Sequence, residues 1–244
     1  MKHFKLALAA TAASLAMASA AHADTTWAFN VGGASDYVFR GIDQTYDFSG
    51  TGDSGFEVFG GVDVSADMFY GGVWLSNTGP NDENGIEYDL YAGIKPSAMG
   101  VNWDLGLIFY GYNDSNGGTV TSAANTIELK VAGSVPVGSA TFGAAVYYSP
   151  EFSTSNEPAT YLEGNAAYTF ENKATISGAV GHQWLNSGFY GVDGYTTWNV
   201  GVTYPITDHV TIDARYIDAD SDASALGGPA AVDGKAVVTL KAAW

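Results

Sequence analysis

Gly234-Lys-Ala-Val-Val-Thr-Leu-Lys-Ala-Ala-Trp244 closes the chain, and the alternation of its side chains indicates the class of fold. One parity is apolar and ends in Trp244, whereas the other carries Lys235 and Lys241. Because a β-strand sends alternate side chains to opposite faces, this stretch predicts a strand with one apolar and one polar face. A strand of a soluble sandwich has this pattern, and so does the closing strand of an outer-membrane barrel, which ends in an aromatic residue at the membrane interface.

Strand-like runs recur along the rest of the chain. The 31 Gly, 15 Tyr, 12 Phe and 6 Trp, with only 7 Pro, favour many strands joined by tight turns. About twelve runs are near the ~9–11 residues that a tilted strand needs to cross a bilayer. The runs are Thr25–Arg40, Gly55–Ser65, Met68–Asn77, Gly85–Lys95, Gly100–Tyr112, Ala124–Val135, Gly138–Ser149, Ala159–Phe170, Lys173–Leu185, Gly194–Tyr204, His209–Ile217 and Gly234–Trp244.

The connections between these runs alternate in length without a break. The short ones are Ala66–Asp67, Pro96–Met99, Pro136–Val137, Glu171–Asn172 and Pro205–Asp208. The long ones are Gly41–Ser54, Thr78–Asn84, Asn113–Ala123, Pro150–Pro158, Asn186–Asp193 and Asp218–Asp233. An up-and-down antiparallel barrel has short periplasmic turns, long extracellular loops and an even number of strands. A soluble sandwich gives no reason for this alternation, so the sequence predicts an all-β transmembrane barrel of about twelve strands.

The other predicted strands also have one apolar and one polar face, when one set of alternate residues in each strand is assigned to the outside of the barrel. With that choice, no Asp, Glu, Lys or Arg inside a predicted strand has to face lipid. Aromatic residues near the strand ends suit two interfacial girdles. The outward residues include Phe56, Val58, Leu90, Leu105, Leu107, Ile127, Leu129, Trp198 and Val200. Four apolar residues, Val38, Phe59, Trp74 and Ile108, fall on the inward face and depart from the pattern.

The first residues predict export from the cytoplasm. Lys2 and Lys5 precede the apolar run Leu6–Ala21, and Ala21-His22-Ala23 fits the small-x-small cleavage pattern. We therefore expect a signal peptide at residues 1–23 and one barrel domain at residues 24–244, in the outer membrane of a Gram-negative cell. The absence of Cys excludes disulfides and thiolate metal sites. The 26 acidic residues against 9 basic ones argue against nucleic acid as a partner.

The most distinctive stretch is Ser35-Asp-Tyr-Val-Phe-Arg-Gly-Ile-Asp-Gln-Thr45, at the end of the first predicted strand. Together with Tyr70–Asn77, Glu87–Gly93 and Val146–Glu151, it resembles the TorF family of porins, which was long known as an uncharacterised bacterial family. The resemblance covers nearly the whole chain after the signal peptide. It implies an outer-membrane barrel and a pore, and it carries over no catalytic residue and no defined substrate.

Some motifs are similar to sites of other chemistry but lack essential parts. Gly52-Asp53-Ser54-Gly55 is similar to a serine-hydrolase segment, but it lies in a Gly-rich loop without a suitable His. Asp218–Asp222 begins like a calcium loop and then lacks the required Gly and Glu, which leaves open only a loose divalent-ion site. His182 and His209 are too few for a histidine metal site. We expect no catalytic, cofactor-binding or metal site.

These observations predict a channel rather than an enzyme. Twelve strands lie between the eight of a barrel filled by side chains and the sixteen to eighteen of an open porin. Small residues on the inward face would leave volume in the lumen, the interior of the barrel. They include Gly61, Gly72, Gly106, Gly143, Ser177, Gly181, Asn199 and Gly201. We expect passive diffusion of small hydrophilic solutes or ions. The expected partners are outer-membrane lipid and the barrel assembly machinery, which typically recognises a terminal aromatic residue such as Trp244.

Two other functions stay open at this point. A structural or adhesive barrel would conduct nothing and would need no continuous lumen. An outer-membrane phospholipase also uses about this many strands, and it would need Ser and His together at the lipid-facing edge. His182 could lie there, but the sequence offers no convincing serine partner. Conductance in a planar bilayer and a lipase assay would separate the three.

Charged residues on the inward face define the predicted pore lining, which consists of Arg40, Glu57, Glu87, Asp89, Glu128, Lys130, Glu163, Arg215 and Lys235. Arg40, Arg215 and Lys235 fall on strands that become neighbours when the barrel closes. They therefore predict a basic wall opposite an acidic wall on the second to eighth strands, and a transverse field between the walls. Local pairing, for example between Arg40 and Glu57, is the alternative. Inward acids outnumber inward bases, which predicts a mild preference for cations.

Overall fold

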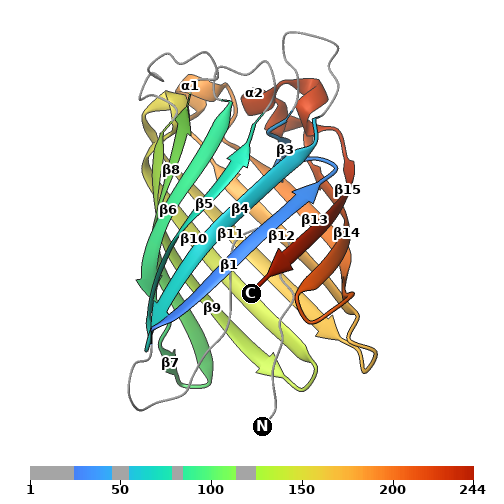
Figure 1. Cartoon of the computed structure of the whole chain (residues 1–244). Helices are drawn as coiled ribbons and strands as arrows, with labels where there is room; N and C mark the ends of the chain where they lie inside the picture. Colours follow the sequence, from blue (N-terminus) through green and yellow to red (C-terminus); the bar gives the residue numbers. More distant parts are fainter. Residues whose placement is uncertain (1–24, 46–54, 79–84, 114–124) are drawn as a thin grey trace.

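A computed structural model describes residues 25–45, 55–78, 85–113 and 125–244. The expected signal peptide at residues 1–23 lies outside this part of the chain, and so do residues 46–54, 79–84 and 114–124 of the predicted long loops. The described chain forms one barrel of long strands (Figure 1). These are β1 (Thr26–Ala34), β4 (Glu57–Ala66), β5 (Phe69–Asn77), β6 (Ile86–Ile94), β8 (Val101–Asn113), β9 (Thr126–Val137), β10 (Ala140–Phe152), β11 (Glu157–Thr169), β12 (Thr175–Trp184), β13 (Gly194–Pro205), β14 (Val210–Ala219) and β15 (Lys235–Ala243).

Hydrogen bonding runs around the whole ring. Each long strand pairs with the next long strand along the chain, and β6 pairs directly with β8 past the two-residue strand β7 (Ser97–Ala98). The ring closes where β1 meets β15, with Gly33 opposite Leu240. All these pairs are antiparallel, so no long strand leaves an unpaired edge. The structure therefore confirms the predicted all-β, up-and-down antiparallel barrel of twelve long strands.

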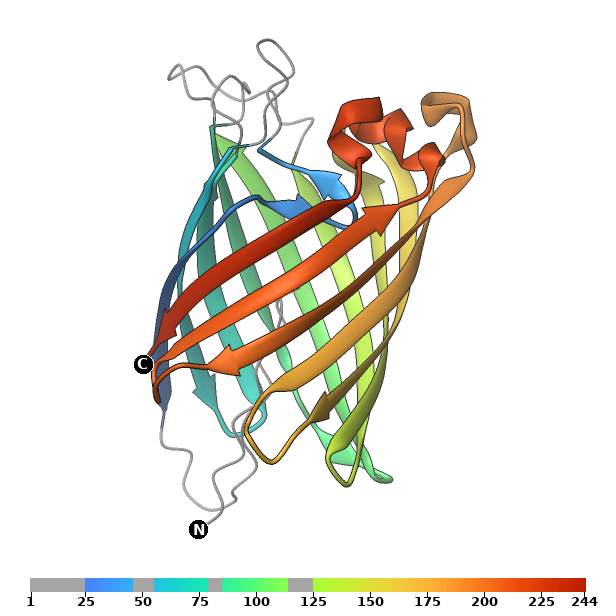
Figure 2. The ribbon, with the colours of Figure 1, turned by 90° about the vertical axis from the view of Figure 1, so that its right-hand side faces the viewer.

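The two ends of the barrel differ in their connections. Short turns lie at the end where β1 starts and β15 finishes, and we call it the turn end (Figures 1 and 2). At this rim the backbone of Trp244 exchanges hydrogen bonds of 3.0 and 3.1 Å with that of Phe29. The longer connections lie at the opposite end, which we call the loop end. The predicted short turns and longer loops are confirmed at the two ends, with one exception. β10 and β11 extend into the predicted loop Pro150–Pro158, so only residues 153–156 separate these strands.

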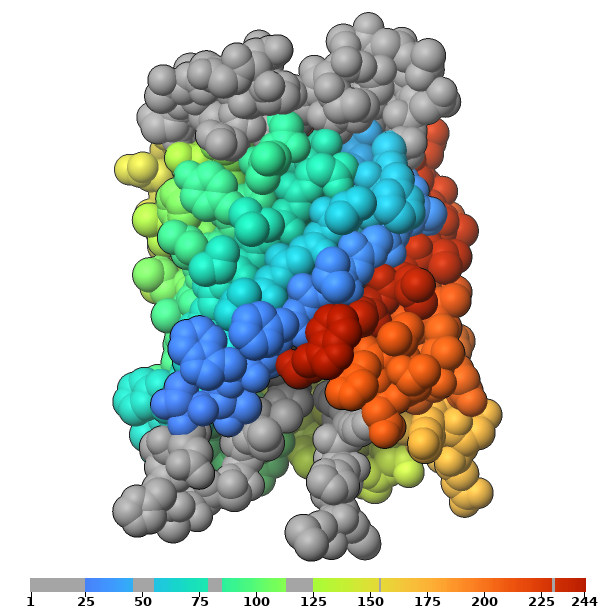
Figure 3. Space-filling model, in the orientation of Figure 1, coloured from blue at the N-terminus to red at the C-terminus, as the bar shows by residue number. Residues whose placement is uncertain are grey.

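The two faces of each strand also differ as predicted. Outward apolar side chains are about half exposed, for example Val58 at 55% and Leu240 at 52%. Figure 3 shows this outer surface over β1, β4, β5, β14 and β15. Inward charged side chains are shielded, with Glu87 and Glu128 at 2%. Transfer of apolar groups out of water lowers the free energy, so the outer face is most stable in an apolar environment.

Short helices lie at the loop end. They are η1 (Ser153–Ser155), α1 (Ser187–Tyr190), η2 (Ser221–Ala223), α2 (Ser224–Gly227) and η3 (Pro229–Val232). Leu185, Tyr195, Ala223 and Val232 form a buried apolar cluster here, and Ile42 packs into the same cluster. Within the described ranges, no helix is long and apolar enough to cross a membrane.

The first strand ends earlier than predicted. β1 finishes at Ala34 rather than Arg40, and the chain then leaves the barrel wall. Two short strands, β2 (Val38–Phe39) and β3 (Ile42–Asp43), pair with each other inside the barrel below the loop end (Figure 2). We call residues 36–45 the inner hairpin. The alternation of side chains continues through this segment, so its pattern cannot be distinguished from that of a wall strand.

Candidate functional site

The inner hairpin turns at Arg40 and Gly41. Phe39 lies opposite Ile42, and the φ angles of Arg40 and Gly41 are 48° and 81°, as in the two-residue turns that suit the twist of a hairpin. A Cβ at Gly41 would lie 2.7 Å from the Cβ of Ala219, so the second position requires Gly. Arg40 is unusual at the first position, where positive φ strains a residue with a side chain by about 1 kcal/mol or more. Contacts of its side chain must offset this strain.

The Arg40 side chain reaches across the lumen to the opposite wall. Both terminal nitrogens donate to the carboxylate of Glu128 at 2.8 Å, and Nη1 also donates to Gln183 Oε1 at 3.0 Å. The guanidinium carbon lies 4.3 Å from the ring centre of Tyr161 and 5.0 Å from that of Tyr147. Burial alone would lower the pKa of Arg40, but Glu128 raises it above the ordinary arginine value. The tip of the inner hairpin is therefore held by a bidentate ion pair.

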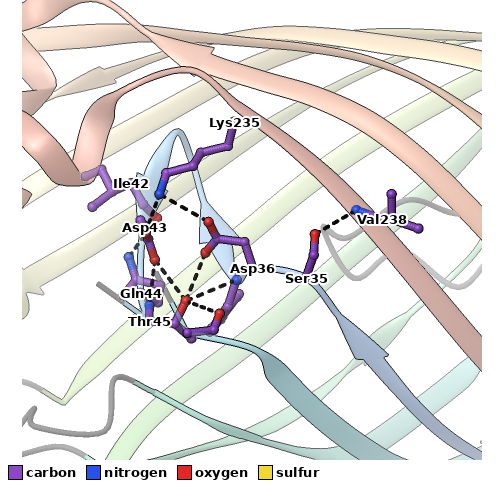
Figure 4. A network of polar contacts seen from close by, with 10 residues as sticks. Ser35, Asp36, Ile42, Asp43, Gln44, Thr45, Lys235 and Val238 are labelled. Carbon is purple, nitrogen blue, oxygen red and sulfur yellow. Dashed lines mark hydrogen bonds and ion pairs between the residues drawn. The ribbon is translucent and has the colours of Figure 1, made fainter. Parts of the chain in front are cut away.

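The base of the inner hairpin is held by a second polar network (Figure 4). Lys235 Nζ lies 2.7 Å from Asp43 Oδ2 and 3.2 Å from Asp36 Oδ2, and all three residues point toward one another. The Thr45 hydroxyl lies 2.9 Å from Asp36 and 3.0 Å from Asp43. Burial raises the pKa of Asp36, as does its Asp43 neighbour, whereas Thr45 and Lys235 oppose the rise. One ammonium group thus balances two buried carboxyl groups.

The side of the lumen formed by β4, β5, β6 and β8 packs against the hairpin with aromatic rings. The Tyr37 ring meets Trp74 edge-on at 5.7 Å, and Trp74 lies 6.1 Å from Phe59. Phe39 lies 5.8 Å from Tyr110. Val38 joins a small apolar cluster beside β15. Of the inward apolar residues that departed from the strand pattern, Val38 therefore lies in the hairpin, Trp74 packs against it, and Phe59 packs against Trp74.

A cavity of about 190 Å³ lies on the other side of the lumen, next to the hairpin. Its wall is formed mainly by β8 to β14, with Val38, Arg40 and Gly41 contributed by the hairpin. On the β5 and β6 side, the rings of Tyr70 and Tyr91 lie 6.5 Å apart and fill the space. The lumen is therefore asymmetric, with aromatic packing on one side and, on the other, a cavity whose lining includes Arg40, Lys130, Glu163 and Arg215.

A family model described as "Bacterial protein of unknown function (Gcw_chp)" matches residues 18–244, which is nearly the whole chain. The chain belongs to this family. The TorF name suggested by the sequence motifs stays a prediction. No curated protein matches the chain.

Two solved structures are similar to the Gcw_chp barrel. The NanC porin is 10% identical, with 88% of this chain and 97% of that chain covered at a TM-score of 0.55. The KdgM porin in complex with disordered oligogalacturonate is 9% identical, with 90% and 98% covered at a TM-score of 0.57. Identity this low establishes a common fold and nothing more specific.

The structure divides the nine predicted pore-lining residues of the Gcw_chp barrel into two groups. Arg40, Lys130, Glu163 and Arg215 line the cavity. Glu57, Glu87, Asp89, Glu128 and Lys235 are not among its lining residues, although Glu128 and Lys235 hold the inner hairpin. Sequence reasoning missed Gln183, Tyr147 and Tyr161, which surround the Arg40 side chain. Tyr147 and Tyr161 pair across β10 and β11, and their place on the inward parity was the available signal.

The predicted basic and acidic walls do not form. Arg40 leaves the wall with the hairpin and binds Glu128 on the side predicted to be acidic. Arg215 pairs with Asp213 at 3.2 Å, and Lys130 pairs with Asp104 at 2.8 Å. The charges therefore form separate pairs, as in the alternative considered from the sequence. The partner of Arg40 is Glu128, however, and not Glu57. The prediction of a transverse field was wrong because it assumed that Arg40 lies on the first strand of the barrel wall.

The small inward residues of the Gcw_chp barrel also have another role than predicted. A Cβ at Gly72 would lie 2.5 Å from the Tyr91 hydroxyl, because the neighbouring ring lies over the glycine. Tyr91 then donates to Asp63 at 2.6 Å. Such glycines make room for large side chains from adjacent strands, so counting them overestimates the open volume.

The residues considered for metal or hydrolase chemistry have local partners. Asp220 accepts from the backbone amides of Thr196 and Asp222, and His182 Nδ1 lies 3.0 Å from the Thr196 hydroxyl. Across the described ranges, no three His, Cys, Asp or Glu side chains are arranged to hold a metal ion. Residues 52–54 of the hydrolase-like segment lie outside those ranges.

Proposed function

We propose that this Gcw_chp protein is an outer-membrane channel through which small hydrophilic solutes or ions diffuse passively. The observation that carries the proposal is a cavity, lined by charged side chains as well as apolar groups, inside a closed barrel whose outer face is apolar. In a bilayer the outer side chains would contact lipid tails, and every strand already has its backbone partners. The NanC and KdgM porins share the fold, which supports the proposal without specifying the solute.

The inner hairpin narrows the proposed path. Arg40 and Gly41 line the cavity, and Arg40 ties the hairpin tip to β9 and β12. A segment held at both its tip and its base would set the size of the solute that passes. The same packing also favours a second function, a barrel that does not conduct, if the hairpin never leaves this position.

Conductance of the purified protein tests the proposal. In planar bilayers we expect discrete, stable current steps that scale with salt concentration, and in liposome swelling we expect entry of small sugars. A heat-denatured sample of the same preparation is the control. Folded protein that inserts and gives neither current nor swelling would favour the non-conducting barrel.

Trp244 should matter for assembly. Its side chain is 61% exposed on the outer surface and stacks on His209 at the rim, where a partner can reach it. We propose that the barrel assembly machinery recognises this residue and that the protein resides in the outer membrane. Deleting Trp244 should lower the amount of folded, heat-modifiable protein in outer-membrane fractions severalfold, whereas Trp198→Phe on the same outer face should not. Unchanged folded protein after the deletion would exclude this role.

A further inference from the structure

We propose that the cavity beside the inner hairpin selects small hydroxylated anions, such as carboxylated sugars, over cations. The inference rests on the proposed channel and specifies its solute class. It replaces the mild cation preference expected from the sequence, which counted every inward charge without knowing where the cavity lies.

The charged lining of the cavity is predominantly basic. Its charged residues are Arg40, Lys95, Lys130 and Arg215 against Asp104 and Glu163. Most inward acids lie elsewhere. Glu57, Glu87 and Asp89 belong to β4 and β6, and Asp36 and Asp43 are bound by Lys235. The excess of acids in the whole barrel therefore does not describe the surface that a solute meets.

The two lining acids already accept hydrogen bonds at both oxygens. Asp104 accepts from the Tyr70 hydroxyl at 2.6 Å and from Lys130 at 2.8 Å. Glu163 accepts from Tyr161 at 3.2 Å and from Asn165 at 3.1 Å. A cation entering the cavity would have to compete with these donors for either carboxylate.

Two of the lining bases, Lys130 and Arg40, have more N–H donors than the hydrogen bonds they make. An ammonium group has three N–H donors, and Lys130 uses one of them on Asp104. A guanidinium has five, and Arg40 makes three hydrogen bonds, all from Nη1 and Nη2. Arg215 uses four of its five donors, on Asp213, Asn199 and Ser177. Lys130 and Arg40 thus keep unused donors, whereas each oxygen of the two lining carboxylates already accepts one hydrogen bond. This arrangement suits a solute rich in acceptor oxygens.

The acids that pair with the two arginines lie outside the cavity lining. Glu128 holds Arg40 and Asp213 holds Arg215, and neither is a lining residue. Each pair therefore forms a dipole whose positive end meets the cavity. Neutral hydrogen-bonding groups complete the wall, including Ser177 and Asn199, which accept from Arg215, and Asn165, which donates to Glu163. Such groups match hydroxyls, which is why we infer a hydroxylated anion rather than a bare halide as the preferred solute.

Reversal potentials under a KCl gradient test the inference. For the wild-type channel we expect chloride to be more permeant than potassium, and in liposome swelling we expect glucuronate to enter faster than glucose. Lys130→Gln with Arg215→Gln should lower the chloride-to-potassium permeability ratio by about fivefold or more, since even one unit charge at ~4 Å in water changes the local concentration of an ion about fivefold. Lys241→Gln is the matched control, because Lys241 lies on the inward parity of β15 but does not line the cavity.

The outcomes separate this inference from the channel itself. No wild-type current would overturn the proposed channel and the inference together. A conducting wild type that prefers cations, or that admits glucose faster than glucuronate, would overturn the inference alone. An equal shift from Lys241→Gln would also overturn it, because the charge would then act without lining the cavity. If the double variant does not fold, Lys130→Gln alone and the two wild-type measurements still decide the question.

Discussion

Arg40→Ala should release the inner hairpin and increase single-channel conductance severalfold. The substitution removes the bonds to Glu128 and Gln183 and leaves the Glu128 carboxylate shielded at 2% exposure. Removing one partner of a buried ion pair costs about 3–5 kcal/mol. We therefore expect a lower free energy of unfolding in urea, together with larger and noisier currents in planar bilayers.

Two further variants separate the side chain from the turn. Arg40→Asn creates an Asn-Gly turn, which the hairpin geometry favours, but it cannot reach Glu128. It should conduct like Arg40→Ala, and a wild-type conductance would show that the turn alone holds the hairpin in place. Combining Arg40→Ala with Glu128→Gln should recover part of the lost stability, because no unpaired charge remains. Strictly additive losses in this double-mutant cycle would contradict the pairing.

Lys235→Ala should weaken the base of the hairpin in a pH-dependent manner. Without the ammonium group, Asp36 and Asp43 lie close together in a site where Asp43 is 1% exposed, and we expect a loss of about 3 kcal/mol near neutral pH. Burial and Asp43 raise the pKa of Asp36 above its ordinary value of 3.8 in the folded state. The folded state then binds more protons than the unfolded state, so this group stabilises at low pH and its contribution is lost as pH rises through the raised pKa.

The difference in unfolding free energy between wild type and Lys235→Ala should therefore shrink as the pH falls toward 3.8. Urea unfolding in lipid vesicles at a series of pH values measures this difference. Lys241→Ala provides the control, because Lys241 lies on the same strand and parity and has no carboxylate within ion-pair distance among the residues described. A difference that stays constant from neutral to acidic pH would contradict the network.

The barrel could be predicted from sequence because its determinants are local. Period-two alternation, the lengths of the connections and the closing aromatic residue each follow from neighbouring residues, and the register of β1 with β15 then follows from closure. The hairpin could not be predicted, because alternation through Ser35–Arg40 is the same in the wall and in the lumen. Phe59 and Trp74 held the missing information. Large apolar residues on an inward face need something to pack against. Here Trp74 packs against Tyr37 of the hairpin, and Phe59 packs against Trp74.

The site was harder to predict than the fold. Inward orientation follows from parity, and Lys130, Glu163 and Arg215 line the cavity from the strands to which the sequence assigned them, whereas Arg40 lines it from the hairpin. Pairing across the lumen depends on which residues lie at the same level along the barrel axis. Parity gives only the direction of a side chain, inward or outward, and not this level. Arg40 meets Glu128 only because the hairpin carries it off its own strand. The predicted cation preference stays a prediction; it gave equal weight to charges inside and outside the cavity, whose charged lining has more bases than acids.

The hairpin also constrains the order in which the protein can fold. Its residues come early in the chain, but Arg40 bonds residues 88 and 143 positions away, and Lys235 lies 192 positions from Asp43. Contacts this distant are slow to form, because ordering the intervening chain costs entropy before any contact is gained. Lys235 belongs to β15, which reaches β1 only when the ring closes. The base of the hairpin can therefore be fixed by Lys235 only when β15 takes its place beside β1.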